Sequence, residues 1–587
     1  MKLHNFHIPV MGIGYTIDSP IKVAAYGIDS VISLVDDKII EQMRKYYSSN
    51  NSLEYTEITD KENDYRANRI TSYLNLVNKL VSTQLNKLKS IASIEDPLYK
   101  KFISLLPNQS DLKKQLTTAT SLSEVLVLLK NNCTKGGIDV NIMTKVDKAN
   151  FVKGEELPTI YNDAHAALRG YANSDLESGI VFSAGLNPRL YSYISEFEDF
   201  YPDADGNIKK KIILKVSDYR SAIIQGKFLA KKGLWVSEYR IESGLNCGGH
   251  AFATNGSLLG PVLKEFKENR EELIATTNEL MVPALEAAGK TVPKNLLKLQ
   301  ITAQGGVGTH EEHDFLVKEY NLDSIGWGSP FLLVPEATTI DKATLTQLEK
   351  AKEEDLVLSD ISPLGVRFNN LKGATKDTEK ANRILRGKPG SPCTKKHVAL
   401  NYEFSKKGLC IASRKYQDLK LKEIDKNEEL SAETKQAAIN KVIDKSCICV
   451  GLGTSALLNY NISTGVEGDG VSICPGPNMA YFTKESSLTN MTQHIYGGTN
   501  VMEHTSRPNL FVKELDLYVS YLQEQLKEYQ LDQSVKAKRS LNKFANNLLA
   551  GISYYKTIFT DTITNAVSNE QTLVNYEGSI HKVLLAL

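Results

Sequence analysis

An apolar run over Leu297–Gln304 ends in Gly305-Gly306-Val307-Gly308, and a polar segment follows at once, Thr309-His310-Glu311-Glu312. Thr309 with Glu312 three residues later has the pattern of a helix start, where free backbone N–H groups and the helix dipole favour an anion. An apolar run, a glycine turn and a helix are the parts of a parallel β/α unit. The stretch therefore predicts one such unit.

The same alternation recurs through residues 1–345. Its apolar runs are His7–Met11, Asp29–Leu34, Asp139–Lys145, Gly179–Ala184, Lys211–Val216, Leu234–Ile241, Leu297–Gln304 and Ser324–Trp327. Eight such units within about 330 residues predict a (β/α)8 TIM barrel, which belongs to the α/β class. The second and third runs lie far apart, and the Leu/Lys/Asn-rich residues between them predict a large helical insertion over about 50–130.

A second glycine loop, Gly326-Trp327-Gly328-Ser329-Pro330, follows the eighth run. The active face of a TIM barrel lies at the carboxyl ends of its strands, and the loops after strands seven and eight commonly bind phosphate. The two glycine loops together therefore predict a phosphate site. Either loop alone also fits a simple tight turn.

Two other strand ends carry candidate site residues. Met11-Gly12-Ile13-Gly14 follows the first run, and glycines there let the backbone approach a flat ligand closely, although a tight turn is an equal interpretation. Gly248-Gly249-His250 follows the sixth run. A histidine at a strand end suits proton abstraction or a hydrogen bond to a ligand, and a structural role for His250 is the alternative.

Three of these segments together resemble the signatures of nitronate monooxygenases and of the related flavin-dependent enoyl-acyl-carrier-protein reductases. They are the Gly248-Gly249-His250 turn, the Gly305-Gly306-Val307-Gly308 loop, and Asp323–Leu332 continuing to Pro335-Glu336-Ala337, in the order of that family. Val181–Pro188 is similar to a family strand that ends in Gly-Leu-Pro. The resemblance lies in motifs spread across the barrel region, not in continuous identity.

The resemblance implies an FMN-dependent oxidoreductase in which His250 acts as the base or contacts the substrate. The implied cofactor contacts are Met11, Gly12 and Gly14 near the isoalloxazine ring, Gly248, Gly249 and Gln304 beside the cofactor, and Gly305, Gly306, Gly328 and Ser329 at the phosphate. The chain departs from the family at Cys247, where Ala or Ser is usual. A thiol beside the flavin and a small buried filler are the two interpretations of Cys247.

Three functions follow from this resemblance. The first is oxidation of a small carbanionic substrate of the nitronate type. The second is a fatty-acid or polyketide type enoyl reductase that takes electrons from NAD(P)H and acts on a substrate held by an acyl carrier; the longer polyketide-type reductases carry extra helices after the barrel and suit this chain length better. The third is a non-catalytic flavin-binding scaffold.

Five of the seven cysteines fall between residues 393 and 474. Cys393, Cys410, Cys447 and Cys449 lie near glycines and prolines, whose turns expose sulfur atoms, so an iron–sulfur cluster or a zinc ion is one interpretation. The spacing is not that of paired CxxC motifs, and a strand over Cys447–Cys449 would project both thiols to one face without completing a ligand set. Buried, redox-inert cysteines are therefore the other interpretation.

The composition of the 587 residues, 41% hydrophobic and 24% charged, is that of a globular protein. A formal net charge of +1 provides no overall field to gather nucleic acid or an anionic membrane, which argues against both as partners. The N-terminus lacks the apolar core of a signal peptide, and no stretch approaches the roughly 20 apolar residues of a membrane span. We therefore expect a cytoplasmic protein with a small-molecule substrate.

Three parts of the chain are expected from these patterns. They are a TIM barrel over 1–345, a cysteine-containing α/β extension over 346–500, and a helical segment over 501–587. Residues 507–529 and 534–557 have helical periodicity with mixed Lys/Glu faces. Such helices are typical of a cap or of a homodimer contact, and a surface for another partner is an equal alternative.

Overall fold

The computed structural model describes residues 2–183, 185–247, 256–503, 507–561 and 566–587. Eight parallel strands close into a barrel in the order β1-β10-β9-β8-β7-β6-β3-β2. They are β1 (Phe6–Ile8), β2 (Asp29–Ser33), β3 (Ile138–Met143), β6 (Ser178–Ser183), β7 (Lys210–Val216), β8 (Val236–Glu242), β9 (Gln300–Gln304) and β10 (Ser324–Gly326). Each predicted run overlaps one of these strands, so the TIM-barrel prediction is confirmed.

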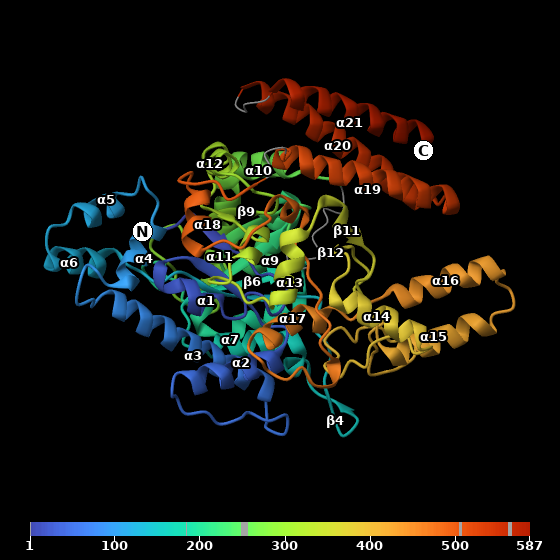
Figure 1. Ribbon diagram of the computed structural model, residues 1–587, viewed down its shortest axis with the longest axis horizontal. Coiled ribbons are helices and arrows are strands. Elements are labelled where there is room, and N and C mark those ends of the chain that lie inside the picture. Colours follow the sequence, from blue (N-terminus) through green and yellow to red (C-terminus); the bar gives the residue numbers. More distant parts are fainter. Residues whose placement is uncertain (1, 184, 248–255, 504–506, 562–565) are drawn as a thin grey trace.

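Helices between the strands surround the barrel. The main ones are α2 (Asp37–Asn50), α3 (Tyr65–Leu88), α7 (Asp163–Ala172), α9 (Tyr219–Ala230), α10 (Leu259–Glu268), α11 (Arg270–Ala287) and α12 (His310–Glu319). The predicted insertion is helical: α3 packs between α2 and α7, and α4 (Pro97–Leu105), α5 (Asp111–Thr118) and α6 (Leu122–Asn132) extend to one side (Figure 1).

The chain beyond the barrel returns to pack against it. Its elements up to residue 500 are α13 (Lys342–Lys350), the antiparallel pair β11 (Leu356–Ser359) and β12 (Phe368–Leu371), α14 (Thr375–Leu385), α15 (Arg414–Lys426), α16 (Ala432–Asp444), α17 (Ile448–Asn459) and α18 (Leu488–Ile495). α15 and α16 pair into a hairpin that projects from the molecule (Figure 1), whereas α17 is largely buried against the barrel. One continuous hydrophobic core includes both Phe6 and Ile448.

One helical stretch, Ala432–Asn459, is long and apolar enough to cross a membrane by length and composition alone. The mean hydropathy of its most apolar part is 1.2, and 67% of that part is buried within the protein. A core helix passes the same test, so the stretch is weak evidence for a membrane span.

Three long helices end the chain: α19 (Leu510–Asp532), α20 (Val535–Asp561) and α21 (Ala566–Ala586). They pack on one another at one edge of the molecule, and α19 and α20 contact α10 (Figure 1). The two ranges predicted from helical periodicity, 507–529 and 534–557, fall on α19 and α20, whereas α21 was expected only as part of the helical segment over 501–587.

Glu514 of α19 joins these helices to the loop after β8. Its carboxylate is fully buried and accepts the N–H of Leu259 at 2.8 Å and that of Gly244 at 3.4 Å, while the Tyr555 hydroxyl lies 3.5 Å away. Burial raises the pKa of Glu514 to about 7. The attachment of α19 to the barrel therefore includes a carboxyl group that titrates near neutral pH.

The raised pKa makes a pH-dependent contribution to stability. Between pH 4.5, the ordinary value for glutamate, and about 7, folded Glu514 retains a proton that the unfolded chain has lost. The free energy of unfolding therefore falls as the pH rises through this window, by about 3 kcal/mol in total. We expect wild type to lose more stability than Glu514→Gln between about pH 5 and pH 8 in urea unfolding. Glu570→Gln, which changes an exposed carboxylate on α21, serves as the control. If the free energy of unfolding changed with pH equally in wild type and Glu514→Gln, the raised pKa of Glu514 would be contradicted.

Candidate functional site

The loops after β8, β9 and β10 approach one another closely at the carboxyl end of the barrel. Gly305 and Gly306 have φ values of +109° and +86°, which glycine adopts without strain. A Cβ atom on Gly305 would lie 2.7 Å from Ser243 Oγ and 3.0 Å from the backbone nitrogen of Asn246. A Cβ on Gly328 would lie 2.9 Å from the Cβ of Cys247. The glycines are thus required because three loops share this space.

A small polar cavity lies between these loops. Residues 245–247, 305–307, 326 and 328–330 line it, together with Asn478 from the C-terminal part of the chain. The four residues Gly305, Gly306, Gly328 and Ser329, predicted to hold a phosphate, are therefore brought together. The cavity has about 10 Å³ of space, which is no more than one water molecule takes up.

Residues 471–478, called the strap here, pack beside this cavity, and Asn478 lines it. Tyr15 donates its hydroxyl to the carbonyl of Ser472 at 2.7 Å, and Ser329 donates its hydroxyl to the carbonyl of Pro475. Asn478 donates its side-chain amide to the carbonyl of Val307 at 2.8 Å. The strap is thus hydrogen-bonded to the glycine loops of β9 and β10.

Cys247 contacts the strap as well. Its thiol donates to the carbonyl of Cys474 at 3.1 Å, and burial raises the pKa of the Cys247 thiol. The Cys247 side chain is buried, as expected of a small filler. It also lines the candidate cavity, as expected of a thiol beside a flavin.

An ion pair covers the start of α12. The Glu312 carboxylate accepts the N–H of Gly308 at 2.9 Å and that of Leu510 at 2.8 Å, and it lies 2.7 Å from Nη1 of Arg507. Arg507 also donates Nε–H to Asn478 Oδ1 at 2.6 Å and Nη2–H to the carbonyl of Gly306. Thr309 caps the helix as predicted, since its hydroxyl accepts the N–H of Glu312 at 3.2 Å.

A second polar group lies at the ends of β7, β8 and β9. Lys215 Nζ lies 2.7 Å from Glu242 Oε1, and both side chains are largely buried. Gln304 donates to Glu242 at 2.7 Å and to Asn246 Oδ1 at 3.1 Å, and Asn246 donates to Glu242. Within the described part of the chain, the buried Oε1 of Gln304 has no hydrogen-bond partner. Such an unused acceptor at a barrel mouth is available to a ligand.

Sequence reasoning proposed Gln304 as a site residue but did not propose Lys215, Glu242, Asn246 or Arg507, which lie in the same two polar groups. Lys215 and Glu242 are polar residues at or next to the ends of two strands, and an inspection of every strand end for charged residues would have found them. Arg507 has no local signal, because it reaches the site from about 200 positions beyond Gly306.

The loop after β1 packs against α17. The N–H groups of Ile13 and Gly14 donate to the carbonyl of Leu452 in α17, at 3.3 and 2.9 Å. A Cβ on Gly14 would lie 3.0 Å from the carbonyl oxygen of Gly453, and one on Gly12 would lie 3.2 Å from the Leu452 side chain. These glycines permit close packing against a helix, and Met11, Gly12 and Gly14 do not line the polar cavity. Gly248, Gly249 and His250 lie outside the described residues.

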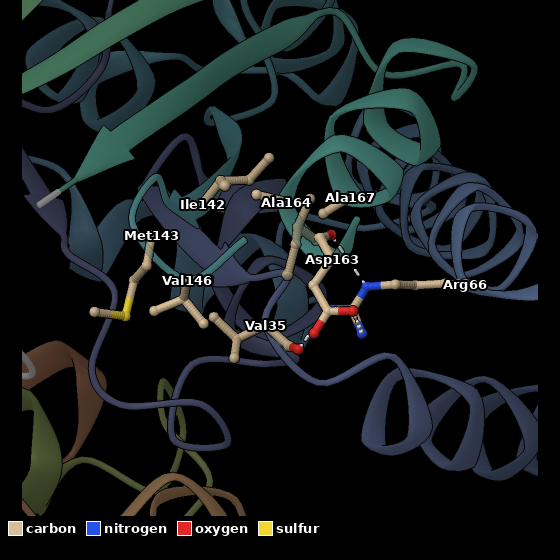
Figure 2. Close-up of a pocket in the computed structure, with 9 residues that line it drawn as sticks. Val35, Arg66, Ile142, Met143, Val146, Asp163, Ala164 and Ala167 are labelled. Atoms are coloured by element: carbon tan, nitrogen blue, oxygen red, sulfur yellow. Dashed lines mark hydrogen bonds and ion pairs between the residues drawn. The ribbon is translucent and has the colours of Figure 1, made fainter. Parts of the chain in front are cut away.

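A second cavity of about 10 Å³ lies beside the ends of β2 and β3, and none of the predicted site residues lines it. Figure 2 shows the guanidinium of Arg66 beside Asp163 among apolar side chains that include Met143. Arg66 donates to the carbonyl of Asp163 at 3.1 Å and to that of Val35 at 2.7 Å. Arg66 also pairs with Asp37 at 2.6 Å, whereas the buried Oδ2 of Asp163 has no hydrogen-bond partner within the part of the chain that the structure describes.

The cysteine region does not form the predicted metal site. Cys393 is hydrogen-bonded to Cys447, and this contact raises the pKa of the Cys393 thiol; burial raises that of Cys410 to about 12. Throughout the ranges that the structure describes, no group of three His, Cys, Asp or Glu residues is placed to hold a metal ion. Cys447–Cys449 do not form a strand, because Cys447 is the N-cap residue of the helix α17 and Cys449 lies within it.

The residues at the mouth fit the chemistry of FMN. Three features suit a phosphate. They are the narrow space beside the glycines, which a Cβ atom would fill, the hydroxyl of Ser329, and the N-terminus of α12. The unused Gln304 acceptor and the neighbouring Lys215 suit the polar edge of a flavin ring. The present cavity is too small for a phosphate, so binding requires the strap to move away from the loops.

The chain matches no protein-family model and no curated protein. It is similar to the solved enoyl reductase domain of MlnA from the macrolactin biosynthesis cluster of Bacillus amyloliquefaciens, with 16% identity and a TM-score of 0.34 over 65% of this chain and 87% of that one. It is also similar to FabK from Thermotoga maritima, with 10% identity and a TM-score of 0.37 over 85% and 93%. The chain is similar as well to nitroalkane oxidase from Streptomyces ansochromogenes, with 9% identity and a TM-score of 0.35 over 84% of this chain and 95% of that one.

The crowding at Gly305 predicts an unusually costly alanine substitution. Gly289 also has a positive φ, +63°, but it is exposed and a Cβ there would meet no atom within 4 Å. We expect Gly289→Ala to lower the free energy of unfolding by roughly 1–2 kcal/mol, because only the backbone conformation is penalised. Gly305→Ala should lower it more, because the backbone at Asn246 must also shift. Urea unfolding measures both, and equal losses would show that the loops are not in close contact.

Proposed function

We propose that this chain is an FMN-dependent oxidoreductase. The observation that carries the proposal is the polar cavity between the loops after β9 and β10, where four of the predicted phosphate contacts converge. Loops seven and eight of a TIM barrel are its usual phosphate site. The buried Lys215–Glu242 pair lies at the neighbouring strand ends, where a bound flavin ring would reach.

Each group of residues has a part in this proposal. Gly305, Gly306, Gly328 and Ser329 would hold the phosphate, and Gln304 and Lys215 would orient the polar edge of the ring. When bound, the flavin supplies the transfer of electrons or hydride, for which the standard side chains have no equivalent. The chain itself binds and orients the reactants and holds or moves a proton.

We infer oxidation of a small carbanionic substrate as the reaction. This choice rests on the resemblance to nitronate monooxygenases, because Lys215 is already paired with Glu242 at 2.7 Å. The role of His250 as the base rests on the resemblance of its Gly-Gly-His turn. A cytoplasmic location belongs to the same proposal.

A reductase that uses NAD(P)H and an acyl-carrier-bound enoyl substrate is the second candidate. It is favoured by the position of the C-terminal part, because the strap and α17 pack directly over the barrel loops. Extra helices after the barrel are what the resemblance to polyketide-type enoyl reductases implies. A non-catalytic flavin-binding scaffold is the remaining outcome of the test below.

An anaerobic absorbance spectrum of the FMN-loaded chain separates these functions. We expect a nitronate to bleach the oxidised flavin bands and air to restore them, while NADH and NADPH leave them unchanged. Bleaching by a reduced nicotinamide alone would identify the reductase. A flavin that none of these reagents bleaches would indicate the scaffold, and a chain that binds no FMN would overturn the proposal.

The proton-transfer role of His250 has its own test. His250→Ala should slow bleaching by a neutral nitroalkane by about a hundredfold or more, because the base is lost. Bleaching by the preformed nitronate should change much less, because no proton has to be removed. His581→Ala, on the exposed side of α21, is the matched control. Equal slowing with both substrates would contradict the base assignment.

A further inference from the structure

We propose that Arg507, from the chain beyond the barrel, is a ligand of the flavin phosphate. This inference rests on the proposed function and adds a cationic contact that the glycine loops lack. Arg507 is buried, with 4% of its side chain exposed, and its guanidinium donates to the carbonyl of Gly306. A Cβ atom on Gly308 would lie 2.7 Å from Arg507 Nε. The guanidinium therefore lies directly against the loop that would receive the phosphate.

The charge of a phosphate requires such a partner. Backbone N–H groups and a helix terminus offer only partial positive charge, and a buried anion without a counter-charge is strongly disfavoured. A guanidinium binds phosphate oxygens through two parallel hydrogen bonds. Arg507 contacts both Gly306 and Asn478, and both of these residues line the cavity.

In the closed arrangement Glu312 takes the position of an anion. Its carboxylate accepts the N–H of Gly308 and pairs with Arg507 at 2.7 Å, so the loop and the arginine are already satisfied by a negative group of the chain itself. Asn478 of the strap completes the set by accepting from Arg507 Nε at 2.6 Å. When the strap moves away, Arg507 loses this acceptor, and a phosphate oxygen can replace it. The carboxylate of Glu312 opposes that exchange by its charge.

The test compares FMN with riboflavin, which has the same ring system and no phosphate. The flavin-free full chain is titrated with each by fluorescence, and the quantity of interest is the ratio of the riboflavin Kd to the FMN Kd. Arg507→Met should lower this ratio about tenfold or more, the loss of one charged hydrogen bond, while leaving the riboflavin Kd within about twofold. Glu312→Gln should raise the ratio, because the competing charge is removed. Arg539→Met, on the exposed face of α20, should leave it unchanged.

The outcomes separate this inference from the proposed function. A wild-type chain that binds FMN tightly and Arg507→Met with an unchanged ratio would overturn the role of Arg507 alone, and equal wild-type affinity for both flavins would do the same. A wild-type chain that binds neither flavin would overturn the proposed function and this inference with it. If Arg507→Met no longer binds riboflavin, the Arg507→Lys variant is measured instead. A lysine cannot make the two parallel hydrogen bonds of a guanidinium, so the ratio of the riboflavin Kd to the FMN Kd should fall in this variant. An unchanged ratio would overturn the inference.

Discussion

The buried ion pair between Glu312 and Arg507 links the barrel to the rest of the chain. Glu312 belongs to the first turn of α12, and Arg507 immediately precedes α19, so the pair ties the glycine loop of β9 to the C-terminal helices. Removing one partner of such a buried pair strongly destabilises the protein, because the other charge then stays buried without a counter-charge. The strap, the loops and α19 therefore hold their positions together. Glu514 adds a second attachment of α19, at the loop after β8.

The site is built from residues distant in sequence. Strands β7 to β10 provide Lys215, Glu242, Gln304 and the two glycine loops, as expected for the carboxyl end of a TIM barrel. The covering layer comes from residues 471–478 and 507, which lie well beyond the last barrel strand. The site thus depends on both parts of the chain, and the barrel alone would leave its mouth open to water.

The barrel could be predicted because each strand is a short apolar run that ends in glycine or a polar residue, a local pattern. The glycine loops were located for the same reason. Local pattern did not reveal what each glycine contacts: Gly12 and Gly14, which the resemblance places near a flavin ring, pack on α17 in this structure. The apolar segment after Cys447 is a helix although its first residues also suit a strand, an ambiguity inherent in short apolar runs. Arg507 and Asn478 act through long-range contacts that no local pattern contains.

The distance in sequence between the loops and the strap has a consequence for synthesis. The ribosome completes β10 at Gly326 and reaches the strap only at Val471. At 5–20 residues per second this interval is roughly 7–30 s. During it the glycine loops have left the ribosome while the segment that covers them does not yet exist. A growing chain therefore exposes its glycine loops before the finished protein covers them, and any ligand present during translation meets no strap to displace.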